Sequence, residues 1–246
     1  MSKLIAVWGC PGSGKTTFSV KLADALYSRN KSGAAIVVVF ADLITPVIPT
    51  VFPNYRSEDV YSIGSVLSKP DIYPDDVVSN LVTVKGRMNL GFIGFKDGEN
   101  KYTYPSYTKE KVKTFYNALR VVADYIIVDC TSMPDDSLLT EVALENADEV
   151  VRLSMPDLKC LSFNMSQIPV FTMLGMMREK ETLVMNVVSQ EFAMPVSDTR
   201  AHLGNPQITV PFSSAIREQY LEGCLYEPMK DRKYTAAVKA VSERLV

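Results

Sequence analysis

Short apolar runs recur along the chain and alternate with stretches in which apolar residues repeat every three or four positions. The runs are rich in β-branched residues, which is typical of strands buried on both faces of a parallel sheet. The repeats are typical of helices with one buried face. The runs predict strands at 4–8, 34–40, 90–95, 125–129, 148–154, 182–188 and 208–211, and the repeats predict helices after residue 15, at 57–69, 108–122 and 135–146, from 155, and at 213–222 and 232–245.

Predicted strands and helices alternate, and no linker, internal repeat or low-complexity segment interrupts the series. This order is typical of a parallel sheet whose crossover helices cover both of its faces. We therefore expect one α/β domain over residues 1–246, with a doubly wound, mostly parallel sheet. Three segments between the elements predict irregular structure: a proline-rich loop at 46–53, an acidic turn at 71–76 and a tyrosine-rich loop at 101–107.

Composition narrows the class of protein. The 246 residues are 47% hydrophobic, which is ample material for a core. The net charge of -2 gives no global electrostatic case for binding nucleic acid, although a local basic patch stays open. No apolar run approaches the ~20 residues that span a bilayer. No signal peptide precedes the first predicted strand, so we expect a cytoplasmic protein.

Cysteine and histidine usage argues against several kinds of site. Four scattered cysteines include no C-x-x-C pair, which predicts reduced thiols rather than a disulfide framework or a zinc site. His202 is the only histidine, and it lies in a predicted loop beside Gly204 and Pro206. We therefore expect neither a histidine-based metal site nor a histidine-based triad. The cysteines are Cys10, Cys130, Cys160 and Cys224.

One glycine-rich stretch carries the strongest chemical signal. It matches G-x-x-x-x-G-K-[ST] at every fixed position, and it lies between a predicted strand and a predicted helix. Such a P-loop cradles phosphates with backbone N–H groups and with the N-terminus of the helix. Lys15 can reach the β- and γ-phosphates, and the Thr16 hydroxyl can bind Mg²⁺. The stretch comprises Gly9, Cys10, Pro11, Gly12, Ser13, Gly14, Lys15 and Thr16, with Thr17 behind it.

Two carboxylates follow predicted strands. Asp129 ends the run at 125–129, and Asp42 comes just after the run at 34–40. Ligands of open α/β sheets bind at the carboxyl ends of the strands, which is where both residues are expected. With a P-loop upstream, Asp129 is predicted to hold Mg²⁺ as a Walker-B carboxylate.

The order of these motifs resembles the ParA/MinD family of P-loop ATPases, including its TadZ/CpaE-like pilus-positioning branch. The P-loop opens the chain, Asp42 follows the second strand, Asp129 ends the middle one, and Asn186 lies on a late strand. Val210 and Pro211 then precede the last helices. The resemblance runs from about residue 3 to residue 245.

The resemblance implies a fold, a ligand and a set of roles. It implies an ATPase that binds ATP and Mg²⁺ and acts as a positioning or partitioning switch. Lys15, Asp42 and Asp129 would be the catalytic residues, with Asp42 orienting the attacking water. Thr16, Asp42 and Asp129 would be the metal-binding residues, and Thr17 would help to hold the phosphates. Asn186 would read the adenine, and the backbone after Pro211 would close the base pocket.

Two positions depart from the family pattern. The family's signature lysine, which reaches across a dimer to the partner's nucleotide, is replaced by Cys10. Only the second acid of the usual Asp-x-Asp is present, as Asp42. We therefore expect slow turnover and only weak dimerisation driven by ATP alone.

Two other functions stay open. The P-loop also resembles that of small-molecule and nucleotide kinases, but those enzymes usually bring several lid arginines to the transferred phosphoryl group. Between Asp129 and Asn186 only Arg152 and Arg178 occur, isolated from each other. A nucleotide-binding scaffold with little turnover is the third reading. The expected partners are a nucleotide, a protein of a positioning, partition or secretion/pilus machine, and a second copy of the chain; DNA or membrane contact and the choice between ATP and GTP stay open.

Overall fold

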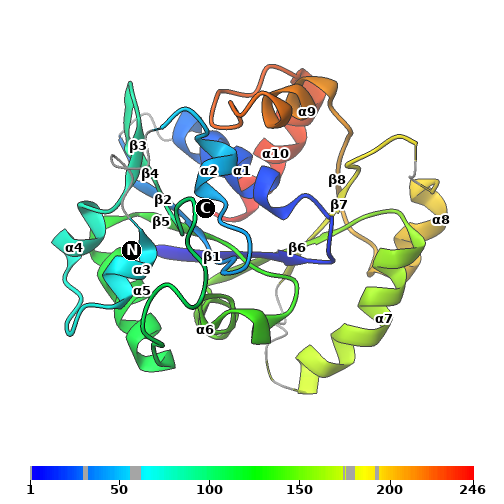
Figure 1. Cartoon of the computed structure of the whole chain (residues 1–246). Helices are drawn as coiled ribbons and strands as arrows, with labels where there is room; N and C mark the ends of the chain where they lie inside the picture. The colour runs from blue at the N-terminus through cyan, green and yellow to red at the C-terminus, as the bar shows by residue number, and fades with distance from the viewer. Residues whose placement is uncertain (1, 30–32, 56–61, 174, 176–180, 192–193) are drawn as a thin grey trace.

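An eight-stranded sheet runs through the centre of the molecule in a computed structural model (Figure 1). The structure describes the chain apart from residues 1, 30–32, 56–61, 174, 176–180 and 192–193. The strand order is β3-β4-β2-β5-β1-β6-β7-β8, and every pair is parallel except β3 with β4. The strands are β1 Lys3–Gly9, β2 Ile36–Phe40, β3 Val82–Val84, β4 Arg87–Ile93, β5 Tyr125–Asp129, β6 Glu149–Ser154, β7 Glu181–Asn186 and β8 Ile208–Val210.

Helices cover both faces of this sheet (Figure 1). On one face α1 and α10 share a hydrophobic cluster with Ile5 and Val7 of β1, and on the other face α5 and α6 share one with Leu4 and Ala6. The alternation of side chains along a strand explains how one apolar run supplies both layers. The helices are α1 Lys15–Arg29, α2 Ile48–Val51, α3 Ile63–Leu67, α4 Pro74–Val78, α5 Lys109–Val122, α6 Leu138–Asn146, α7 Leu158–Met173, α8 Val196–Arg200, α9 Ser214–Leu221 and α10 Arg232–Arg244.

The predicted fold class is confirmed: the sheet is mostly parallel and is covered by helices on both sides. Several local predictions need correction. The proline-rich loop at 46–53 contains the short helix α2, the acidic turn at 71–76 leads into α4, and strand β3 was missed. Part of the helix predicted at 57–69 lies outside the described residues, and α3 forms its second half. None of the helices in the described ranges is long and apolar enough to cross a membrane.

The prediction of four reduced thiols is wrong for one pair. Cys10 and Cys160 form a disulfide, whereas Cys130 and Cys224 are free. The two bonded cysteines are 150 residues apart in sequence, so no local sequence pattern predicts the bond. They meet because β1 and β6 are neighbours in the sheet, and Cys10 follows β1 while Cys160 lies in the helix after β6.

Candidate functional site

The P-loop lies at the carboxyl end of β1, between Gly9 and the first residue of α1. Gly12 and Gly14 have positive φ angles of 79° and 77°, which favour glycine. A Cβ on Gly14 would also lie only 2.8 Å from Nδ2 of Asn186, so the packing requires glycine there. The first N–H groups of α1 have no acceptor within the helix, and together with the loop they form a cradle for an anion.

Lys15 is held at this cradle by oxygen atoms of its own loop and of the loop after β5. Its Nζ donates to Ser132 Oγ at 2.7 Å and to the carbonyl oxygens of Gly9 and Cys10 at 3.3 Å. Burial lowers the pKa of the ammonium group, and the nearby Asp129 carboxylate opposes that shift. Ser132 is fixed in turn because its carbonyl oxygen accepts from Nε1 of Trp8 at 3.0 Å.

Asp129 and Thr16 form the innermost polar pair of the site. The Thr16 hydroxyl donates to Asp129 Oδ2 at 2.6 Å. The Asp129 side chain is buried, and no group in the described part of the chain hydrogen-bonds to its other oxygen, Oδ1. Burial raises the pKa of this carboxyl from 3.8 to about 6. A hydroxyl beside an unpartnered buried carboxylate oxygen is the kind of oxygen-donor set that Mg²⁺ takes in phosphate-binding sites, so these residues fit the metal that the sequence implied.

Asp42, in the loop after β2, lines the same cavity as Thr16 and Asp129. Its Oδ1 accepts from the backbone N–H groups of Ile44 at 2.8 Å and Thr45 at 2.9 Å, which fixes the carboxylate in a turn. The cavity has a volume of about 620 Å³. Its other polar lining residues include Lys15, Thr16, Thr17, Asp129, Thr131, Ser132 and Asp136.

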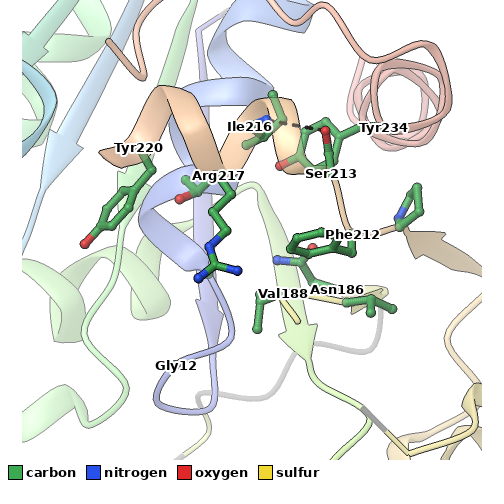
Figure 2. Close-up of a pocket in the computed structure, with 13 residues that line it drawn as sticks. Gly12, Asn186, Val188, Phe212, Ser213, Ile216, Arg217, Tyr220 and Tyr234 are labelled. Carbon is green, nitrogen blue, oxygen red and sulfur yellow. Dashed lines mark hydrogen bonds between the residues drawn. The ribbon is translucent and has the colours of Figure 1, made fainter. Parts of the chain in front are cut away.

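A smaller cavity of about 170 Å³ adjoins the P-loop on its other side (Figure 2). Asn186, at the end of β7, donates from Nδ2 to the carbonyl oxygen of Ser13 at 2.8 Å. This bond ties the last residue of β7 to the P-loop. The backbone from Pro211 to Ser213 closes another wall, and the Ser213 side chain caps α9 by accepting from Ile216 N. The two cavities share Gly12, Gly14, Thr17 and Tyr220 as lining residues.

The structure therefore brings the predicted site residues to one edge of the sheet, with one difference. The Cys10 side chain is buried and bonded to Cys160, so only its backbone faces the P-loop, where its carbonyl oxygen accepts from Lys15 Nζ and Ser13 N. Sequence reasoning did not single out Ser132, which lines the larger cavity, or Arg217, which lines the smaller one. The first follows Asp129 by three residues and the second lies on the helix after Pro211, so both sit near segments that the motifs had already identified.

Comparison with known proteins supports this architecture through structure alone. No family model matches the chain, and no curated protein matches it in sequence. Among solved structures, the septum site-determining protein MinD with Mg-ADP from Pyrococcus horikoshii has a TM-score of 0.73 at 22% identity, over 99% of this chain and 96% of that one. A ParA family ATPase from Chlorobium tepidum has a TM-score of 0.76 at 15% identity, over 100% and 99%.

A third similar structure holds a nucleotide analogue. It is a putative plasmid partition protein from Borrelia burgdorferi bound to AMPPNP, with a TM-score of 0.73 at 14% identity over all of both chains. The fold of this chain is therefore that of the ParA/MinD-type P-loop ATPases, as the sequence resemblance implied. None of these structures points specifically to the TadZ/CpaE-like branch.

Proposed function

We propose that this chain binds Mg-ATP and hydrolyses it slowly, as a regulatory ATPase of the ParA/MinD type. The observation that carries the proposal is the cavity that Lys15, Thr16, Asp129 and Asp42 line together. It contains a phosphate cradle, the Lys15 ammonium group and the carboxylates of Asp42 and Asp129. The second cavity continues from it past the P-loop and has room for the planar part of a nucleotide.

The chain's own residues divide the work of binding. The N–H groups of residues 12–17 and the Lys15 ammonium group hold the phosphates. Thr16 and Asp129 would hold the metal, and Asp42 lines the same cavity. Because Asn186 Nδ2 already donates to Ser13, its amide oxygen is the atom that accepts from the 6-amino group of adenine. This preference supports ATP over GTP, whose base has a carbonyl oxygen there.

Hydrolysis requires a water molecule to be placed in line with the terminal phosphate. Asp42 is the residue that orients this water, because two backbone N–H groups fix its carboxylate in the cavity. A Mg²⁺ ion held by Thr16 and Asp129 would neutralise part of the negative charge of the phosphates. A signature lysine would add a second cation, but at that position the side chain of Cys10 is bonded to Cys160. A missing cation at the transferred phosphoryl group predicts slow turnover.

Cys10 also affects how the chain would dimerise with a second copy of itself. A Cys10 side chain bonded to Cys160 cannot reach a partner's phosphates. ATP alone then drives dimerisation weakly, and a partner protein of a positioning, partition or secretion machine completes the active state. Among the similar structures is a MinC:MinD complex from Aquifex aeolicus, in which a protein of this fold does bind a partner. Light scattering with and without Mg-ATP measures the dimer directly, and a tight dimer without a partner would contradict this part of the proposal.

Product analysis tests the proposed reaction against its alternatives. Incubation with Mg-ATP should release inorganic phosphate slowly, and Asp42→Ala should bind ATP and release at least about tenfold less, because only positioning in the transition state is lost. A kinase would instead transfer the phosphoryl group to an added acceptor. A scaffold would bind ATP and release no phosphate, and equal rates for parent and Asp42→Ala would show that the role given to Asp42 is wrong.

A further inference from the structure

One positive charge lies in the smaller cavity and has no assigned role. Of the described residues that line this cavity, Arg217 is the only charged one, and the others are glycines, apolar residues, two tyrosines, Thr17, Asn186 and Ser213. None of these described lining residues carries a carboxylate. A guanidinium group in such surroundings attracts an anion, because no opposite charge neutralises it locally.

The position of Arg217 on α9 directs its charge at the P-loop. Its side chain extends from the helix toward the turn at Gly12, and Asn186 and Phe212 lie to the right of the guanidinium group in this view (Figure 2). Within the described ranges the guanidinium group makes no ion pair and no hydrogen bond, whereas its backbone N–H donates to Ser213 O within the helix. The charge is therefore available to a ligand.

The path of a bound nucleotide follows from the two ends of the site. Asn186 marks the base end, and Lys15 marks the β- and γ-phosphate end. The ribose and the first phosphate must lie between them, along the wall that the two cavities share. That wall comprises Gly12, Gly14, Thr17 and Tyr220, and Arg217 lies one helical turn from Tyr220 on α9.

We propose that the Arg217 guanidinium group binds the α-phosphate of the nucleotide, the phosphate next to the ribose. The inference rests on the proposed function and adds a residue to it. A planar guanidinium group donates two parallel hydrogen bonds to the oxygens of one phosphate, which a lysine ammonium group cannot do. Since the α-phosphate is common to ADP and ATP, this contact holds the nucleotide before and after hydrolysis.

Calorimetric titration of the full chain with Mg-ADP and Mg-ATP tests the assignment. Arg217→Gln should weaken both nucleotides by the same factor, about ten- to a hundredfold, because a charge-assisted pair of hydrogen bonds is lost. Arg217→Lys keeps the charge without the fork and should recover only part of the affinity. Arg244→Gln is the matched control, since it removes the same charge from an exposed position in the last turn of α10, and it should leave both affinities unchanged.

A thiophosphate nucleotide identifies the phosphate that is contacted. Sulfur is a weaker hydrogen-bond acceptor than oxygen, and each diastereomer of ADPαS replaces one of the two non-bridging α-phosphate oxygens. The penalty of Arg217→Gln should therefore be smaller for both diastereomers than for ADP. An equal penalty for ADP and both diastereomers, or a penalty for ATP alone, would place the guanidinium group elsewhere and overturn the proposal.

Two results separate this inference from the proposed function. If the parent binds Mg-ADP, Lys15→Ala does not, and Arg217→Gln binds like the parent, the nucleotide site stands and the role of Arg217 is wrong. If the parent binds neither Mg-ADP nor Mg-ATP, the proposed function fails, and the role of Arg217 fails with it.

Discussion

At the scale of single residues, the burial that suits Asp129 to hold a metal ion also makes its ionised form destabilise the fold. Its carboxyl is buried, one oxygen lacks a hydrogen-bond partner among the described groups, and its pKa rises to about 6. The folded protein therefore binds this proton more tightly than the unfolded chain does. The free energy of unfolding therefore falls as pH rises from about 4 to 6, and it stays lower by the same amount at neutral pH.

The first prediction at this scale concerns Asp129→Asn in the presence of EDTA. An amide keeps an oxygen that can accept from Thr16 and removes the buried charge, so the free energy of unfolding at pH 7.5 should rise, by at most about 3 kcal/mol. The gain should vanish near pH 4, where the parent carboxyl is protonated. Denaturant unfolding at both pH values measures it.

The same variant should lose its response to magnesium. In the parent, Mg²⁺ should tighten ATP binding relative to EDTA, whereas Asp129→Asn should bind ATP equally with and without the metal, since an amide is a poor ligand for Mg²⁺. A less stable variant that still responds to Mg²⁺ would contradict both parts of this account.

At the scale of elements, one buried lysine holds the P-loop helix against the helix of the base pocket. Lys21 of α1 is fully buried, and its Nζ donates to Gln219 Oε1 on α9 and to the carbonyl oxygens of Leu225 and Glu227. The neighbouring Asp24 pairs with Arg87 at 2.8 Å. Movement of α9 relative to α1 would leave these polar groups without partners, so the two parts of the site are held in one geometry.

This contact predicts an unusual pH dependence. Burial lowers the pKa of Lys21 from 10.5 to about 8, with the Asp24 carboxylate opposing the shift. Between pH 8 and 10.5 the unfolded chain holds this proton more than the folded protein does, so the contribution of Lys21 to stability rises with pH. The free-energy difference between parent and Lys21→Met should increase by about 2 kcal/mol from pH 7.5 to 9.5.

Urea unfolding of the parent and of Lys21→Met at both pH values measures that difference. The contributions of the other titratable groups, which both proteins share, cancel in it. A difference that stays constant with pH would show that Lys21 keeps an ordinary pKa in the fold.

Element prediction succeeded where burial dictates the pattern. β2, β5 and the centre of β1 are buried on both faces, so their apolar runs were unambiguous. β3 has only three residues and pairs with β4 alone, so it carries too few apolar positions to show a period. The short helices α2 and α4 start at or beside a proline, which predicts a helix start as readily as a loop.

At the scale of the whole molecule, the site is assembled from distant segments by the order of the strands. The P-loop follows β1, Asp129 ends the neighbouring β5, and Asp42 follows β2 beyond it. On the other side, β7 and β8 bring in Asn186 and the start of α9. The P-loop motif and the strand ends predicted Lys15, Asp42 and Asp129 from local sequence, and the family resemblance added Asn186.

The contacts that depend on this order could not be predicted from sequence. The bond from Cys10 to Cys160 requires α7 to lie beside the P-loop, and the place of Arg217 requires α9 to lie over it. No local sequence pattern around a cysteine or an arginine predicts a neighbour that lies more than a hundred residues away in the chain. Ser132 likewise gains its contact with Lys15 only because β5 and β1 are adjacent.

Isothermal calorimetry with Mg-ATP can establish whether the P-loop cavity is a nucleotide site, as we claim. The parent should bind with one site per chain, and Lys15→Ala should lose about a hundredfold or more in affinity, because a charge-assisted contact to the phosphates is removed. Lys159→Ala, an exposed lysine on α7, should bind like the parent. A folded Lys15→Ala protein that binds Mg-ATP as tightly as the parent would contradict the claim.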